Sequence, residues 1–146
     1  MLPPSALRTI EAAISESEKH HYGELRFVVE AHLRLPALIH GMTARERAIE
    51  LFSHLRIWDT EHNSGVLIYL LLADRDVEII ADRGIHHRVG DAEWETICKK
   101  MEQEFRQQHF EAGVLHGIHA ISELLARHFP ASTNNVNELP DTTVVL

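Results

Sequence analysis

Residues 65–82, GVLIYLLLADRDVEIIAD, contain two apolar segments joined by a short polar connection. Residues 65–73 are apolar on both alternating faces, which is the pattern of a strand covered on both sides of a sheet. Residues 76–82 have the composition of a second strand. The connection Ala-Asp-Arg-Asp, residues 73–76, is short and polar, so we predict an antiparallel hairpin between the two strands.

The parallel partner of the buried strand lies upstream of it. The segment ELRFVVEAHL, residues 24–33, predicts a strand with one apolar face, made of Leu25, Phe27, Val29 and Ala31. Thr43 and Glu46 then form a capping box that opens a helix, whose inward positions are Ala48, Leu51, Phe52 and Leu55. A strand, a helix and a second strand in this order form a right-handed crossover, and its two strands are parallel.

Three more helices flank this core. Apolar spacing predicts one over residues 4–19, a second that is capped by Asp91, and a third over about 110–128. Residues 33–42 and 83–90 are expected to be loops. The predicted fold is therefore of the α/β class, with a small mixed sheet built from a parallel βαβ unit and an antiparallel hairpin.

The length of 146 residues suits a single domain, which we place over residues 1–130. Residues 131–146, ASTNNVNELPDTTVVL, are mostly polar, and we predict a disordered C-terminal tail. The net charge of −8 argues against a nucleic-acid partner, which would need a basic face.

The compartment is inferred from three absences in the sequence. Cys98 is the single cysteine, so no internal disulfide can form, which fits a reducing compartment. The first residues lack the basic and apolar regions of a signal peptide. The longest apolar run, residues 66–73, is far shorter than the roughly 20 residues that span a bilayer. We expect a cytoplasmic protein without direct membrane insertion.

The predicted topology gathers polar residues at one rim of the sheet. The start of the first strand, the start of the second and the end of the third all lie at this rim, because the first two are parallel and the third is antiparallel. The rim residues are His20, His21, Glu24, Asp59, Thr60, Glu61, His62, Asn63, Asp82, Arg83, His86, His87 and Asp91.

Two interpretations of this rim stay open. Carboxylate and amide oxygens from Asp59, Asn63 and Asp82 are ligands suited to Ca²⁺ or Mg²⁺, while rim histidines could hold Zn²⁺ and Arg83 could clamp a phosphate. The further rim candidates are Thr60, Glu61, His62, His86 and His87. The alternative is that these residues form turns and helix caps, as Asp, Asn and Gly do at strand ends.

Two other features invite a chemical role. His116, His119 and Glu123 share one face of the last helix, but this face lies opposite the apolar stripe, so we expect it to be solvated. Cys98 is flanked by core positions and is expected to be a small buried hydrophobic residue rather than a nucleophile.

The segments NSGVLI, residues 63–68, and DVEIIADRGI, residues 76–85, resemble the TPM domain family, and Phe110 with Gly113 is similar to its Phe-x-x-Gly near the last helix. That family includes a plant thylakoid lumen acid phosphatase and related bacterial proteins. The resemblance implies a three-layer α/β/α sandwich, and calcium binding or phosphatase activity near an Asn-Asn-Gly turn. Asn63 matches the first Asn of that turn, Asp59 is the acidic residue before it, and Ser64 replaces the second Asn.

Three functional hypotheses follow. The favoured one is a non-catalytic interaction or regulatory module with a divalent-cation site on the rim, acting with a membrane protein or another protein. The alternative is a metal-dependent phosphatase-like hydrolase, in which a bound cation polarises a phosphoryl oxygen. The third is a metal-free domain whose rim contains turns only.

Overall fold

The computed structural model describes residues 2–131 and 138–146. In chain order the elements are α1 (Pro4–Ser17), β1 (Glu24–Glu30), α2 (Leu35–Ile39), α3 (Ala44–His54), β2 (Gly65–Leu71), the 3₁₀ turn η1 (Leu72–Asp74), β3 (Asp76–Ala81), α4 (Arg83–His86), α5 (Asp91–Arg106), α6 (Phe110–His128) and β4 (Val144–Val145).

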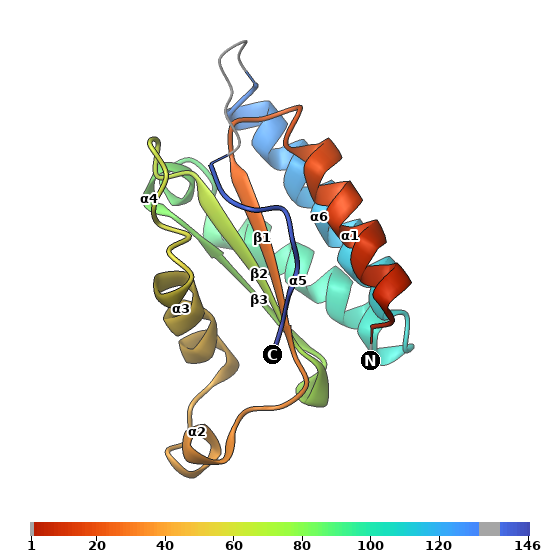
Figure 1. Cartoon of the computed structure of the whole chain (residues 1–146). Helices are drawn as coiled ribbons and strands as arrows, with labels where there is room; N and C mark the ends of the chain where they lie inside the picture. The colour runs from red at the N-terminus through yellow and green to blue at the C-terminus, as the bar shows by residue number, and fades with distance from the viewer. Residues whose placement is uncertain (1, 132–137) are drawn as a thin grey trace.

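The sheet has the strand order β3-β2-β1-β4 and is mixed (Figure 1). β1 and β2 are parallel, with Leu25 opposite Val66, and the hairpin makes β3 antiparallel to β2, with Leu67 opposite Ile80. The hairpin turns through Arg75, whose φ of 50° is in the left-handed region. The predicted combination of a parallel βαβ unit and an antiparallel hairpin is confirmed.

Helices cover both faces of the sheet (Figure 1). α1, α5 and α6 pack on one face, where Phe27 and Ile68 belong to the larger core cluster. α3 packs on the other face, against Leu67 and Tyr69. All seven residues of β2 are buried, because β2 contributes side chains to both core clusters. This is the expected three-layer α/β/α sandwich.

The helix boundaries differ from the prediction at three places. Residues 33–42 and 83–90, expected as loops, contain the short helices α2 and α4. Asp91, expected as the cap of the next helix, is its first residue, and Gly90 is the N-cap without a side-chain hydrogen bond. The predicted N-cap at Thr43 is confirmed, because the N–H of Glu46 donates to Thr43 Oγ1 over 3.1 Å, while the Glu46 carboxylate accepts from the Thr43 hydroxyl over 3.1 Å. No helix in the described part of the chain is long and apolar enough to cross a membrane.

The prediction of a disordered tail is wrong for residues 138–146. Val144 and Val145 form β4, which pairs in parallel with β1, and the C-terminus runs beside that strand (Figure 1). Leu139 is buried in the core cluster under α3. Thr143 donates from its N–H and its hydroxyl to Glu11 Oε1, over 2.9 and 3.0 Å. These contacts are distant in sequence, so local polarity did not indicate them. The predicted disorder of residues 132–137 lies outside the described residues.

Candidate functional site

The rim assembles from the three segments that the topology predicts. The N–H of Gly84 donates to the carbonyl of Asn63, and the N–H of Asp82 donates to that of Gly65, both over 2.9 Å. The N–H of Glu24 donates to the carbonyl of Ser64, also over 2.9 Å. Asn63 has a φ of 51°, a left-handed conformation that Asn tolerates better than most residues. The turn before β2 is therefore clamped between the start of β1 and the end of β3.

The two carboxylates proposed as cation ligands each have a local partner. Asp59 is exposed and lies 3.4 Å from the guanidinium of Arg56. Asp82 is the N-cap of α4, and its Oδ1 accepts the N–H of Arg83 over 2.7 Å. The second oxygen, Asp82 Oδ2, is buried and has no hydrogen-bonding partner among the described residues. The Asp82 segment therefore packs against the turn of Asn63, while the Asp59 side chain pairs elsewhere.

Four further rim candidates, Thr60, Glu61, His62 and His86, also make local contacts, while Arg83 and His87 are exposed. Thr60 Oγ1 accepts the N–H of Ser64 over 2.8 Å, and the N–H of Glu61 donates to Glu138 Oε2 over 3.0 Å. The ring of His62 lies 5.4 Å from that of Tyr22, and His86 lies 3.7 Å from Asp91. Within residues 2–131 and 138–146, no three His, Cys, Asp or Glu side chains form a group that could hold a metal ion.

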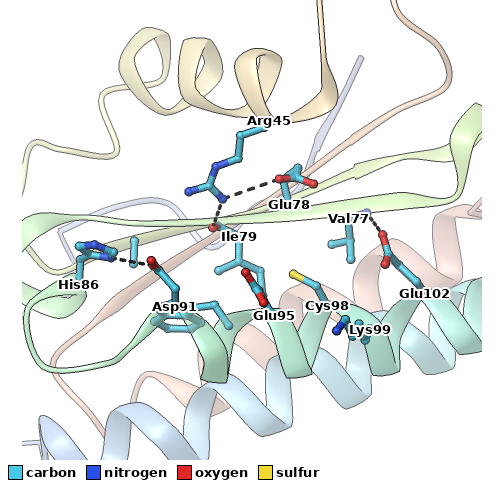
Figure 2. A pocket seen from close by; sticks show the side chains of 12 residues that line it. Arg45, Val77, Glu78, Ile79, His86, Asp91, Glu95, Cys98, Lys99 and Glu102 are labelled. Carbon is cyan, nitrogen blue, oxygen red and sulfur yellow. Dashed lines mark hydrogen bonds and ion pairs between the residues drawn. The ribbon is translucent and has the colours of Figure 1, made fainter.

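A groove of about 420 Å³ runs from the rim along the outer edge of β3 (Figure 2). Arg45 reaches over it from α3, and α5 forms the opposite wall, with Glu95 pointing toward β3. The lining residues are Arg45, Val77, Glu78, Ile79, Ala81, His86, Asp91, Trp94, Glu95, Cys98, Lys99 and Glu102. No local sequence pattern indicates this groove, because its walls come from separate elements; of its lining residues, only His86 and Asp91, at the end next to the rim, belong to the predicted rim.

The floor of the groove is the open edge of a sheet. The bond from Asp82 N to Gly65 O fixes the alternation of the β2–β3 ladder, so the peptide groups of residues 77, 79 and 81 point away from β2. Two of these groups bond to side chains. The N–H of Val77 donates to Glu102 Oε2 over 3.3 Å, and Arg45 donates to the carbonyl of Ile79 over 3.0 Å. In the described chain, the N–H groups of Ile79 and Ala81 have no protein acceptor.

Carboxylates outnumber cations in the groove. Four carboxylates line it, namely Glu78, Asp91, Glu95 and Glu102, against the two cations Arg45 and Lys99. Arg45 lies 3.7 Å from Glu78. At the end of the groove away from the rim, where β3 begins, burial raises the pKa of Asp76 to about 6. Burial, with a smaller contribution from the neighbouring Asp76, also raises the pKa of Glu102. These two carboxyls therefore hold their protons to higher pH than exposed carboxyls do, and Lys99 lies beside Glu102 on the same wall (Figure 2).

Two further groups in the groove bear on its chemistry. Burial raises the pKa of the Cys98 thiol to about 12, so the thiolate needed for nucleophilic attack is scarce at neutral pH. Trp94 is 6% exposed, and its indole Nε1 is a buried donor without an acceptor among the described residues. The groove thus offers hydrogen-bond donors and negative charge, without an activated nucleophile among its described side chains.

The histidines of α6 lie away from this groove. His116, His119 and Glu123 are exposed, which confirms the predicted solvated face. His116 lies 3.4 Å from Glu104 of α5.

Comparison with known proteins adds a family and a fold. The family model described as TPM domain matches residues 1–124. The solution structure of the BA42 protein from the psychrophilic bacterium Bizionia argentinensis is 29% identical, with a TM-score of 0.89 and coverage of 100% of this chain and 96% of that one. The N-terminal domain of a protein from P. gingivalis is 17% identical, with a TM-score of 0.71 and coverage of 88% and 78%.

A third solved structure, the N-terminal domain of the cg2496 protein from Corynebacterium glutamicum, is 11% identical. Its TM-score is 0.63, and the match covers 99% of this chain and 80% of that chain. No functionally curated protein matches this chain. The likeness to these two N-terminal domains concerns the fold alone.

Proposed function

Since the chain belongs to the TPM domain family, we propose that it acts as a non-catalytic interaction or regulatory module. The observation that carries this proposal is the groove whose floor is the open edge of β3. An open strand edge presents unpaired N–H and C=O groups, and these are the groups with which sheets bind other polypeptides. The partner in this proposal is a protein, with a membrane protein as one candidate.

The use of the polar side chains supports this proposal over a hydrolase. Glu102 and Arg45 bond to the main chain of β3, and Asp82 caps α4. A hydrolytic site needs a nucleophile next to a base, or a metal with an open position. The groove residue that comes nearest to a nucleophile is Cys98, and burial keeps its thiol protonated by raising its pKa.

A phosphomonoesterase assay separates the module from the phosphatase-like alternative. We expect that p-nitrophenyl phosphate, incubated with the whole protein and Ca²⁺, Mg²⁺ or Zn²⁺ in turn, releases phosphate at the rate of the buffer control. The variants Asp59→Ala and Asp82→Asn should give the same rate. Turnover by the unmodified protein that either substitution abolishes would contradict the module and establish the hydrolase, since a contaminating enzyme would not respond to those substitutions.

We further propose that the rim binds a divalent cation, with calcium as the candidate, and that this regulates the module. The supporting observation is Asp82 Oδ2, a buried carboxylate oxygen without a hydrogen-bonding partner in the described chain. Such an oxygen is costly to desolvate, and a hard cation would satisfy it. Asn63 would contribute a second side-chain oxygen, and Asp59 a third once its exposed side chain leaves the ion pair with Arg56. Binding there would hold the turn before β2 against the end of β3.

Calcium titration followed by NMR tests this cation site. Amide shifts are expected to concentrate at Asp59, Asn63 and Asp82, and Asp82→Asn should weaken binding by about tenfold or more, because it removes a ligand charge. Glu93→Gln, a change of equal charge at an exposed position of α5, serves as the control and should leave the affinity unchanged. Absence of shifts at millimolar calcium would rule out the cation while leaving the interaction module intact.

A further inference from the structure

We propose that the groove along β3 binds an extended peptide segment that carries a lysine or arginine side chain. This inference rests on the proposed interaction function and specifies its partner by chemistry. The main chain of the peptide would bond to the outward peptide groups of β3, and its basic side chain would meet the carboxylates of α5.

The strand edge provides the main-chain contacts. The outward N–H groups of Ile79 and Ala81 have no acceptor among the described residues. An added strand bonds to every second residue of the edge that it joins, which matches the spacing of these two groups. The opposite edge of the sheet is already occupied, because β4 pairs with β1 there. The chain's own C-terminal segment thus shows that this sheet accepts a short added strand.

The charge of the groove selects a basic segment. Glu95 is exposed, points toward β3 and has no ion pair within the described residues (Figure 2). Glu102 lies further along the same wall, beside Asp76. A lysine or arginine that enters between α5 and β3 would pair with these carboxylates, whereas an acidic side chain would be repelled. Charge complementarity of this kind decides which partner binds more than how tightly it binds.

Trp94 provides an independent indication of a ligand. Its side chain lines the groove, is 94% buried and carries an indole N–H without an acceptor among the described residues. Buried donors are rarely left without a partner, because the desolvation cost is not recovered. The N–H has no exposed surface in the unbound protein, so in this proposal the indole shifts toward the groove on binding, where a carbonyl of the peptide supplies the acceptor. Trp94 therefore acts in this proposal as a positioning donor at the wall of the groove.

Arg45 is the side chain that a bound peptide displaces. Its guanidinium donates a hydrogen bond to the carbonyl of Ile79 and forms an ion pair with Glu78, but 56% of its side chain is exposed. Charged residues on an open edge commonly protect it against unwanted strand pairing. Arg45 protects the edge of β3 in this way, and its positive charge also repels a basic ligand. Removing Arg45 should therefore strengthen peptide binding.

The test uses two blocked heptapeptides of alternating threonine and valine, one with a central lysine and one with a central glutamate. Each is titrated into the whole ¹⁵N-labelled protein. We expect the lysine peptide to shift the amides of Ile79 and Ala81 and the indole N–H of Trp94. The glutamate peptide should bind at least about tenfold more weakly, as expected when like charges meet at an interface.

Three variants sharpen this test, and two of them have effects of opposite sign. Glu95→Lys should weaken binding of the lysine peptide by about five- to tenfold, whereas Arg45→Ala should tighten it by about threefold or more. Glu93→Lys is the matched control, because it makes the same charge change on an exposed position of α5 that does not line the groove. Its affinity should equal that of the unmodified protein.

Several outcomes would overturn the inference. These are equal binding of both peptides, no shifts with either at millimolar concentration, or shifts of Ile79 and Ala81 that follow protein concentration without peptide. The last result would mean that two copies of the chain pair through β3. A different result would contradict the proposed function, namely metal-dependent phosphate release that Asp59→Ala or Asp82→Asn abolishes.

Discussion

Replacing Gly84 by alanine is expected to lower the free energy of unfolding by at least about 3 kcal/mol, because the added methyl group collides with main chain. A Cβ at this position would lie 2.7 Å from the carbonyl oxygen of Asn63 and closer still to that of His62. Both neighbours are backbone atoms, so no side-chain rotation can relieve the collision. The turn before β2 would have to move away from the end of β3.

The matched control for this substitution is Gly90→Ala. Gly90 is exposed, has a φ of −72°, and a Cβ there would meet nothing within 4 Å. It should change stability by less than about 1 kcal/mol, the range of a weak cap exchange. Urea unfolding monitored by circular dichroism measures both variants. Equal stability of the two variants would mean that the rim is not packed as the structure has it.

Replacing Glu18 by glutamine is expected to stabilise the protein at pH 8 by at least about 1 kcal/mol, since one pKa unit corresponds to about 1.4 kcal/mol. Glu18 is 9% exposed, its Oε2 accepts the N–H of Leu25 over 2.7 Å, and it shares a hydrogen bond with Asp141. Burial, the hydrogen bond with Asp141 and the negative charge of Glu24 raise the pKa of Glu18 far above its usual range. A glutamine could accept from Leu25 and donate to Asp141 without a proton to lose.

The sign of the pH dependence follows from the raised pKa. Below about pH 4.5, the carboxyl is protonated in both the folded and the unfolded protein, so it does not affect their balance. As pH rises above that value, the unfolded state ionises while the folded state holds the proton, and stability falls until the folded pKa is reached. Glutamine removes this loss, so the advantage of the variant should be present at pH 8 and vanish near pH 4.

Urea titrations at pH 4 and pH 8 measure this difference. Glu16→Gln is the control, because Glu16 is in the last turn of α1, two residues before the C-cap Glu18, but is exposed and pairs with Lys19. It should change the pH dependence little, because an exposed pair such as Glu16 with Lys19 is screened by solvent. If Glu18→Gln instead destabilised the protein at pH 8, Glu18 would be a favourably ionised carboxylate in the folded state, and its contact with Asp141 would require another explanation.

The predicted rim shows where sequence reasoning about the site succeeds and where it stops. Chain topology brings Asn63 and Asp82 to the same rim, because strand direction follows from the crossover and the hairpin. Topology does not decide where side chains point. Asp59 forms an ion pair with Arg56, and Asp82 caps α4. Neither contact can be predicted from the spacing of the residues in the sequence.

The groove and the C-terminal strand required the structure for a different reason. Arg45, Ile79 and Glu95 become neighbours through the packing of α3, β3 and α5, and no local pattern links them. β4 has two residues, too few to show strand periodicity, and it is held by contacts to Glu11 and β1. Such contacts join residues more than a hundred positions apart, so composition alone indicated disorder.

The α/β class, the parallel and antiparallel pairing of β1, β2 and β3, and the apolar stripes that bury α1, α3, α5 and α6 can all be predicted from the sequence. Those properties depend on apolar periodicity and short connections, which are local in the chain. Only the tertiary structure decided the fourth strand, the orientation of the rim carboxylates and the groove at β3. Each of these depends on atoms from segments far apart in sequence, which come together only when the chain has folded.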